Sequence, residues 1–505
     1  MSKKIKNGIS YDLNGWKYIS VKGSASERGY AYGYFIAKEF KKIQEMLNFV
    51  IYQDFGETWD FFIDASTKLY NDKIKKEFKE FYDEMDGIAK GINAGGTKTS
   101  LDEIIAWNNY FALTEGWYSN KDAVSGKPVA HHGEGGGGRT GASERCSCFM
   151  ATGDYTSDGK IVCAHNNFSN FVDGQYANCV VDMHCDNGNR FLMQCFCGYI
   201  WSGTDFFVTD KGIIGSETTI GGFLPFENNY PISCRIRKAM QYGDTLDDYV
   251  KILLDGNSGD YANSWYFGDI NTNEILRIEL GLKYYNVERT KNGFFIGFNA
   301  AFDPKIRNLE CVAHGFNDIR RHQGSRKVRL EDLVEEHKGK INIEVAKLIL
   351  SDHYDVYLNK ENPCSRTVCS HYNLDPREYT DSTRPDPYQP RGAIDGSVID
   401  STMAKNMSFE LKFGSSCDIA FDADEFFDKH RQWKHLKPYV FSRPLQPYTL
   451  FKITDKYSNS NTSKGSNKAN TKSNTSTINR IKSQKQNNRS IRLKKINKNN
   501  KTVKI

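Results

Sequence analysis

The run Arg145-Cys-Ser-Cys-Phe places a cysteine at the start of a strand-like segment, directly after a glycine-rich stretch. Such a cysteine can attack the carbonyl of the preceding peptide bond and cut the chain before itself. The cut would give Cys146 a free α-amino group with a pKa of about 8, close to that of a thiol. This amine could then serve as the general base for the thiol. Cys146 is therefore a candidate nucleophile, and the Arg145–Cys146 bond is a candidate cleavage site.

Other interpretations of these cysteines remain open. A strand cysteine is often simply a small buried side chain, and alternation along a strand puts Cys148, a rival nucleophile, on the same side as Cys146. The pairs Cys146-x-Cys148 and Cys195-x-Cys197 are spaced more tightly than common zinc ligands. We therefore predict no metal ion and no organic cofactor. A disulfide framework is not expected either, because the start of the chain carries no signal-peptide pattern.

The residues before Cys146 have a mostly helical pattern. Apolar residues recur at helical spacing from Ser26 to Ile43, from Phe78 to Ile92 and from Leu101 to Phe111. Ser100 has the residue type and place of a helix N-cap. Residues 121–144 contain the run GEGGGGR, which is typical of a flexible, exposed linker.

After Cys146 the pattern changes to short strand-like runs separated by turn signals such as Asp-Gly and Asn-Gly. Two helices are predicted between them, at 234–242 and 246–254. Strands with an interposed helix pair favour a layered α+β fold over a doubly wound one. The predicted strands are 148–152, 160–164, 178–184, 190–195, 206–208, 265–269, 274–279 and 294–298.

Composition divides the chain into three parts. Residues 456–505 hold 14 Lys and Arg and no Asp or Glu, and they have scarcely an apolar side chain, so we predict a disordered basic tail. The other 455 residues carry 54 basic and 62 acidic side chains. We predict a helical N-terminal segment with its linker at 1–145, a catalytic domain at 146–455 and the tail at 456–505.

Several function classes are disfavoured by these features. A mildly acidic globular part gives no reason to expect nucleic acid as the main partner. No stretch reaches the roughly 18 to 20 apolar residues that span a bilayer. With no signal peptide visible, a cytoplasmic location is our expectation.

Several ordered motifs resemble known families. The run from Cys146 to Gly153, then Asp158-Gly-Lys and Ala164-His-Asn, resembles the autoproteolytic acyl-transferases and hydrolases of family C45. Four further motifs resemble the phospholipase B-like proteins, and the choloylglycine hydrolases are more distant relatives. These motifs are SGTDFF from Ser202, ETT from Glu217, GDYANSW from Gly259 and RGAIDG from Arg391. The likeness extends over roughly residues 20 to 440 and identifies the chain as a member of the N-terminal-nucleophile (Ntn) hydrolase superfamily.

The resemblance implies a four-layer αββα fold with Cys146 as the first residue of the mature catalytic chain. It also implies further site residues. His165 would tune the thiol or orient substrate, although a strand histidine bonded to a neighbouring carbonyl remains the alternative. Thr219 would lie near the oxyanion or be an ordinary sheet threonine. Asn299, which follows a strand, would donate to the oxyanion, for which one donor in a dry pocket contributes about 3 kcal/mol.

Two departures from the family patterns bear on the mechanism. Several relatives carry an aspartate three residues after the position of His165, where it holds the α-amine of the nucleophile. This chain has Phe168 there, so another group must hold the amine. The residue before the cleavage site is Arg145, where the penicillin acyl-transferase has glycine.

The sequence therefore leaves two hypotheses from different classes. In the first, a self-processing cysteine hydrolase cleaves an acyl amide or ester, with phospholipase B-like deacylation of lipids as the favoured substrate class. Its partners would be that small molecule and its own N-terminal fragment. In the second, the chain stays uncleaved as a non-catalytic scaffold or binding protein.

Overall fold

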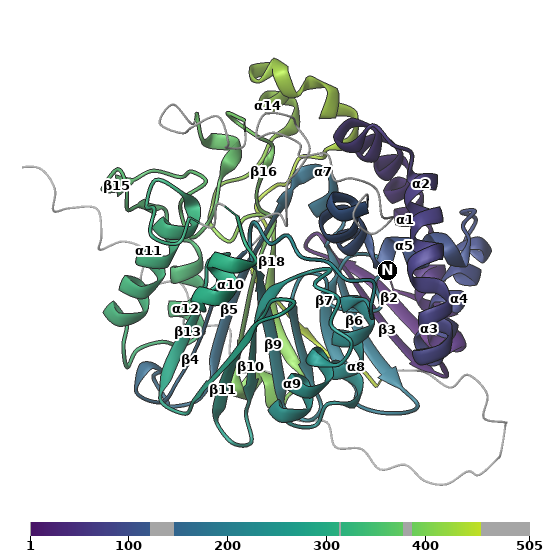
Figure 1. The fold of residues 1–505 in the computed structure, drawn as a ribbon, viewed down its shortest axis with the longest axis horizontal. Helices are drawn as coiled ribbons and strands as arrows, with labels where there is room; N and C mark the ends of the chain where they lie inside the picture. Colours follow the sequence, from purple (N-terminus) through teal and green to yellow (C-terminus); the bar gives the residue numbers. More distant parts are fainter. Residues whose placement is uncertain (1, 122–145, 313–314, 377–385, 456–505) are drawn as a thin grey trace, which may run out of the picture. The chain divides into compact units, whose positions relative to one another are not determined.

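The computed structural model describes residues 2–121, 146–312, 315–376 and 386–455 (Figure 1). These residues belong to one contact unit, which extends from Met1 to Tyr457. Residues 122–144 of the predicted linker, Arg145 and the predicted disordered tail lie outside the described residues. The fold is mixed α+β with large sheets, in agreement with the predicted class.

In the described part of the chain, ten strands form one sheet. Neighbouring strands pair antiparallel except β3 with β6, which pair parallel and join the N-terminal strands to the rest. The strands in sheet order are β1 (Lys3–Ile5), β2 (Gly8–Leu13), β3 (Trp16–Gly23), β6 (Cys179–Cys185), β7 (Phe191–Cys195), β8 (Phe206–Thr209), β9 (Ile213–Thr219), β10 (Asn263–Asp269), β11 (Glu274–Leu280) and β12 (Tyr285–Thr290).

The second large sheet contains seven of the described strands, all paired antiparallel. Its strand β4 begins at Cys146 and lies between β13 and β5. The main path is β13 (Gly293–Gly297), β4 (Cys146–Thr152), β5 (Val162–Asn170), β17 (Asp395–Asp400), β18 (Ser408–Phe413) and β19 (Thr449–Lys452), and β16 (Arg391–Ala393) pairs with the end of β5. A separate hairpin joins β14 (Tyr354–Asp355) to β15 (Lys360–Glu361).

Alternating side chains of the two sheets enter different hydrophobic cores. Cys148 and Met150 of β4 pack with Val180 and Leu192 of the larger sheet, so one core lies between the sheets. Phe149, from the opposite face of β4, packs against helices instead. This alternation with a period of two residues is what a strand buried on both faces requires.

Helices cover the outer faces of both sheets (Figure 1). On the larger sheet they include α1 (Ala25–Phe55), α4 (Lys79–Ala94), α5 (Leu101–Asn108), α8 (Ile232–Tyr242) and α9 (Leu246–Leu254), whose apolar residues share one core with its strands. On the smaller sheet they include α11 (His322–Glu336) and α12 (Ile343–Leu350). The remaining helices are α2 (Trp59–Ser66), α3 (Asp72–Glu77), α7 (Phe171–Gly174), α10 (Pro304–Leu309), α13 (Ser401–Lys405) and α14 (Ala423–Lys429).

Local sequence signals explain several helix boundaries. Ser24 forms a capping box with Glu27 at the start of α1, and Gly56 ends this helix in the left-handed conformation, with φ of 67°. The predicted N-cap Ser100 is confirmed, because its hydroxyl accepts from the backbone N–H of Glu103 at 3.1 Å. Helix α1 extends to Phe55, well beyond the predicted Ile43.

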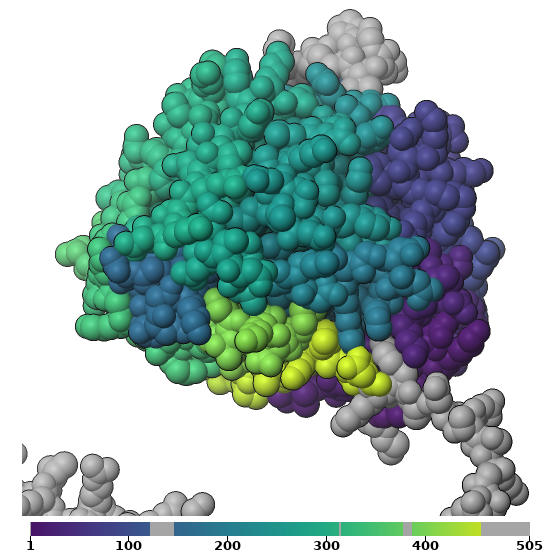
Figure 2. Space-filling model, turned by 90° about the horizontal axis from the view of Figure 1, so that it is seen from below, coloured from purple at the N-terminus to yellow at the C-terminus, as the bar shows by residue number. Residues whose placement is uncertain are grey.

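The N-terminal segment contains three strands in addition to the helices that the sequence predicts. Strands β1 to β3 precede α1, and β3 pairs along its whole length with β6, which follows Cys146 in the chain. The end of the described chain also returns to these strands, since Tyr18 donates to the carbonyl of Lys452 at 2.9 Å. Figure 2 shows purple N-terminal residues and the yellow end of the described chain on the same face. Residues on both sides of the predicted cleavage site therefore share one sheet.

Within the described residues, no helix combines the length and the apolar character needed to cross a bilayer.

Candidate functional site

Cys146 is the first residue of β4 and is completely buried. Its backbone N–H donates to Oδ1 of Asn299 at 3.0 Å. This nitrogen is the atom that would become the α-amine if the chain were cut before Cys146. The contact therefore identifies Asn299 as the group that holds this nitrogen.

Asn299 is fixed from three sides. It follows β13 and adopts a left-handed backbone conformation, with φ of 69°, which asparagine tolerates better than most residues. Its Nδ2 donates to the carbonyl of Thr219 at 2.8 Å, and its Oδ1 accepts a second hydrogen bond from Nη2 of Arg326 at 2.7 Å. These bonds orient the amide oxygen toward the nitrogen of Cys146.

Arg326 of α11 contacts several groups of this site at once. No pattern in the sequence indicates it. Its guanidinium, on a buried side chain, donates to the carbonyl of Cys146 and to Oγ of Ser147, the latter at 3.2 Å. It also donates to the carbonyl of Phe298 at 3.2 Å and lies over the ring of Phe168, 5.1 Å from the centroid. A planar group with several fixed donors suits such a bridging position.

Two acidic residues, Asp205 and Glu217, lie near the thiol of Cys146 on the side of the larger sheet. The sulfur of Cys146 and one carboxylate oxygen each from Asp205 and Glu217 lie within 4.8 Å of one another, and all three residues are buried. Burial raises the pKa of the Cys146 thiol well above its usual value, and the charges of Glu217 and Asp205 raise it further. In the uncut chain the thiol is therefore held protonated at neutral pH.

A third buried carboxyl, that of Asp395, lies in the same region as Asp205 and Glu217. Oδ1 of Asp395 accepts from the backbone N–H of Asn167, the strand partner of Cys146, at 3.2 Å. Its Oδ2 accepts from Nε2 of Gln194 at 2.6 Å. Burial raises the pKa of Asp395 to about 7, so this carboxyl exchanges a proton near neutral pH.

His165 lies opposite Cys148 in the pairing of β4 with β5, two residues along the strand from the register of Cys146. Burial lowers its pKa to about 3, and the nearby backbone of Glu217 offsets this only in part. The imidazole is therefore neutral at physiological pH. Among the described residues, the structure shows no direct contact between His165 and the Cys146 thiol. The role predicted for His165 therefore stays a prediction.

Thr219 lies close to the site through its backbone. Its carbonyl accepts from Asn299, and its hydroxyl lies 2.8 Å from the hydroxyl of Tyr261. These contacts make Thr219 a support for Asn299. The predicted roles of Thr219 and Asn299 at an oxyanion stay predictions, and Arg145 lies outside the described residues.

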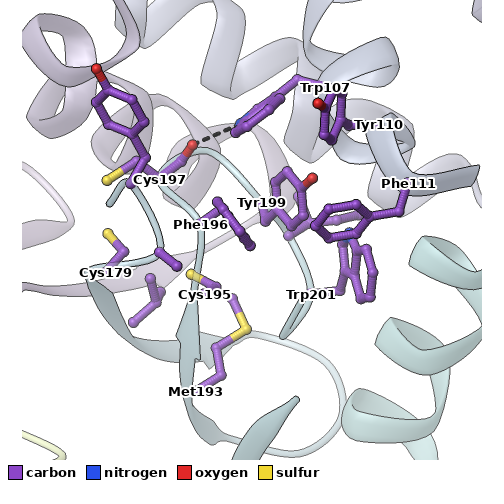
Figure 3. Close-up of a cluster of buried hydrophobic side chains, with 14 of the residues drawn as sticks. Trp107, Tyr110, Phe111, Cys179, Met193, Cys195, Phe196, Cys197, Tyr199 and Trp201 are labelled. Carbon is purple, nitrogen blue, oxygen red and sulfur yellow. Dashed lines mark hydrogen bonds between the residues drawn. The ribbon is translucent and has the colours of Figure 1, made fainter. Parts of the chain in front are cut away.

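The loop that carries Asp205 is held by the N-terminal helices (Figure 3). Nε1 of Trp107 donates to the carbonyl of Cys197 at 2.8 Å, the dashed line in Figure 3, and Asn108 bonds to Gly198 and Ile200. The aromatic rings drawn there pack between α5 and residues 196–201. The N-terminal segment thus positions one wall of the site.

The rival nucleophile Cys148 lies deeper in the core between the sheets, where its sulfur donates to Oγ of Ser216 at 3.5 Å. Four phenylalanines that are close to Cys146 or to the motif SGTDFF in the sequence lie in separate hydrophobic cores. Phe149 packs under the helices of the smaller sheet and Phe207 under those of the larger one, while Phe206 lies between the sheets and Phe168 in a further small cluster.

The arrangement supports two kinds of chemistry. A thiol, a held backbone nitrogen and buried carboxyls suit nucleophilic attack coupled to proton transfer. Cys146, Asp205 and Glu217 also offer three ligand atoms of types that bind divalent metals. The motifs SGTDFF and ETT contain Asp205 and Glu217 and could have drawn attention to them, whereas no local signal marked Arg326.

Comparison with known proteins gives little further guidance. No family model matches the chain. An uncharacterized protein of Archaeoglobus fulgidus is 24% identical over 264 residues, which is 51% of this chain and 42% of that protein. The chain thus covers less than half the length of this relative, and the similarity identifies no family.

Proposed function

We propose that this protein is a self-processing cysteine hydrolase of the Ntn type, with Cys146 as its nucleophile. The observation that carries the proposal is the hydrogen bond from the backbone nitrogen of Cys146 to Asn299, at the first residue of a buried strand. A buried backbone N–H at the start of a strand needs a partner, and here that partner is a side chain held in place by two further hydrogen bonds. A nucleophile that uses its own amine as base needs such a group.

Maturation would proceed by attack of the Cys146 sulfur on the carbonyl carbon of Arg145. The carbon–nitrogen bond of the peptide breaks, a thioester forms, and the thiol proton ends on the released α-amine. Water then hydrolyses the thioester, which leaves a carboxylate on Arg145 and a free thiol on Cys146. Asn299 and Arg326 would hold the nitrogen and the carbonyl of Cys146 throughout.

The mature site would act on an acyl substrate by the same chemistry. The α-amine takes the thiol proton as sulfur adds to the acyl carbonyl, and the proton passes to the departing amine or alcohol. Water releases the acid from the thioester. Asp205 and Glu217 would stabilise the positive charge of the protonated α-amine, because they lie around the thiol of the same residue.

The order of packing supports this proposal. Helices, the ten-stranded sheet, the seven-stranded sheet and further helices follow one another through three hydrophobic cores. This is the order of a four-layer αββα sandwich, and we infer that the chain has the Ntn-hydrolase fold that its motifs resemble. Fold alone does not select a substrate.

For the substrate we propose an acyl amide or ester with an apolar acyl group, as in the deacylation of lipids. The resemblance of four motifs to phospholipase B-like proteins favours this class. Because Cys146 is completely buried in the uncut chain, substrate would reach the thiol only after cleavage.

A non-catalytic scaffold remains the second candidate, and one observation favours it. Burial and the charges of Glu217 and Asp205 raise the pKa of the Cys146 thiol, which makes it a poor nucleophile while the chain is intact. The self-processing account requires another group to take the thiol proton before the cut, because the α-amine of Cys146 exists only afterwards. The scaffold account requires no activation.

The test is intact mass and N-terminal sequencing of the purified protein, incubated at neutral and mildly acidic pH. We expect a fragment that begins Cys-Ser-Cys-Phe, together with its N-terminal partner. Cys146→Ala should abolish this fragment, whereas Cys148→Ala, two residues along the same strand, should retain it. An uncut wild-type chain under all these conditions would sink the proposal and favour the scaffold.

A further inference from the structure

Four metal-binding side chains meet at a place that the proposed reaction does not use. His353, Cys369, His371 and Cys417 each offer one ligand atom, and these four atoms lie within 4.8 Å of one another. Cys369 and Cys417 are not joined in a disulfide, and His371 is almost completely buried. Two sulfur and two nitrogen ligands in a closed tetrahedral group are the set that structural zinc takes in proteins. We propose that these four residues form a structural zinc site.

The distances around His371 fit a central metal ion. Its Nε2 lies 3.4 Å from the sulfur of Cys369 and 3.3 Å from the sulfur of Cys417. A tetrahedral ion with zinc–sulfur bonds of about 2.3 Å and zinc–nitrogen bonds of about 2.0 Å separates sulfur from nitrogen by roughly 3.5 Å. Hydrogen bonds alone explain the pair of contacts less well, because Nε2 has either one proton or one lone pair to share with two sulfurs.

The four ligands come from three separate segments. His353 immediately precedes β14, Cys369 and His371 lie in the loop that follows β15, and Cys417 lies in the loop after β18. The backbone N–H of Cys417 also contacts the sulfur of Cys369, the kind of outer hydrogen bond that thiolate ligands of metals commonly accept. A zinc ion would therefore join the end of a sheet strand to a long loop.

That loop has little regular secondary structure. Residues 351–375 contain only two-residue strands and one helical turn. Charged and polar groups dominate its interior, such as Arg366, which bonds to Asp355, and Ser365, which donates to Asp375 at 2.6 Å. A segment with so little apolar surface gains much of its order from a metal ion that binds only the folded form.

The site also adjoins the nucleophile region. Cys369 and Cys417 pack against Phe168, and the guanidinium of Arg326 lies over the ring of this phenylalanine. Arg329, one turn further along α11, bonds to Asp352 next to the ligand His353. The zinc ion would be structural, and its loss would loosen the surface on which Arg326 lies.

The experiment is elemental analysis of the full-length protein purified in reducing buffer without chelators. We expect about one equivalent of zinc per chain, and retention of tetrahedral geometry when cobalt replaces zinc, seen as thiolate-to-cobalt absorption. Cys369→Ser and Cys417→Ser should each remove most of the zinc. Cys364→Ser, in the same loop but outside the group of ligands, should keep it.

If the serine variants fail to fold, the wild-type protein still decides the question. A strong zinc chelator should lower its Tm, and added zinc should restore it. A folded wild-type protein without zinc, with iron or copper in its place, or with a disulfide between Cys369 and Cys417 by peptide mass, would overturn the assignment.

Discussion

Arg326 shows how a single side chain can control the geometry of the candidate site. It contacts the carbonyl of Cys146 and the amide oxygen of Asn299, so it sets the position of the nucleophile and of the group that holds its nitrogen. Because these contacts need a flat group with donors in fixed directions, a lysine cannot replace them even though it keeps the charge.

Arg326→Lys should therefore slow self-cleavage by about tenfold to a hundredfold, which corresponds to about 1.4 to 3 kcal/mol in the barrier. The rate of appearance of the Cys-Ser-Cys-Phe fragment measures the effect. Arg329→Lys is the matched control, because it lies on the same helix and bonds to Asp352 instead. Equal rates for both variants would show that Arg326 does not position the nucleophile.

Asp395 gives the site a pH dependence near neutrality. Burial raises its pKa to about 7, whereas an unfolded chain has the ordinary aspartate value. The folded state therefore binds this proton more tightly, and the resulting stabilisation is complete at about pH 4 and lost as the pH rises through about 7. The stabilisation lost between these two pH values is at most roughly 4 kcal/mol of unfolding free energy.

Asp395→Asn removes this titration and keeps the shape of the side chain. Relative to the wild type, the free energy of unfolding of the variant should improve steadily from about pH 4.5 to about pH 7.5. Urea denaturation at several pH values measures this difference. Two parallel stability curves would contradict the assigned pKa.

Helices α1 and α4 lie unusually close at the scale of secondary-structure elements. Glycines spaced four apart on both helices, at 29 and 33 and at 87 and 91, face the backbone of the other helix. A Cβ on Gly33 would lie 2.1 Å from the carbonyl oxygen of Ile88, and one on Gly91 would lie 2.1 Å from that of Tyr30. Only glycine permits this contact of backbone with backbone.

Gly33→Ala should force the two helices apart and lower the free energy of unfolding by about 1 to 3 kcal/mol, despite the higher helix propensity of alanine. Thermal or urea denaturation measures the loss. Lys38→Ala, on the exposed side of the same helix, should change stability little. A stabilised Gly33→Ala protein would show that the helices can separate without cost.

A buried charge network connects the parts of the whole molecule on either side of the proposed cut. Glu84 of α4 accepts from Arg28 at 2.6 Å and from Arg237 of α8 at 2.8 Å, and all three side chains are buried. Burial alone would raise the pKa of Glu84, but the guanidiniums of Arg237 and Arg28 outweigh it and lower the pKa below its usual value. Together with the pairing of β3 and β6, this network should keep the two fragments together after cleavage.

Glu84→Gln leaves Arg237 buried without its carboxylate partner, so we expect the free energy of unfolding to fall by about 3 to 5 kcal/mol. Urea denaturation measures this loss, and size-exclusion chromatography of cleaved wild-type protein should show both fragments in one peak. Asp86→Asn, which removes a surface ion pair from the same helix, is the control. An unchanged urea midpoint for Glu84→Gln would show that the network does not stabilise the fold.

What the sequence determines by itself is local. Periodicity predicted the α+β class, the helices at 78–92 and 246–254 and most strands after Cys146, because each depends on neighbouring residues alone. Periodicity did not select Cys146 over Cys148, a choice that came from the resemblance to known families. It gave no signal for β1 to β3, whose partner β6 lies more than 150 residues away in the chain.

Only the tertiary structure decides which distant residues meet. Arg326 lies 180 positions from Cys146, and the four residues of the proposed zinc site lie on three segments with none of the usual spacing. Asp205 and Glu217 approach the thiol because two sheets stack face to face, and the register of that stacking depends on packing throughout the molecule. Asp395 comes close because β17 and β4 are both neighbours of β5 in the smaller sheet. The sequence could suggest a candidate nucleophile, but the charges and donors around Cys146 follow from long-range contacts that local patterns do not encode.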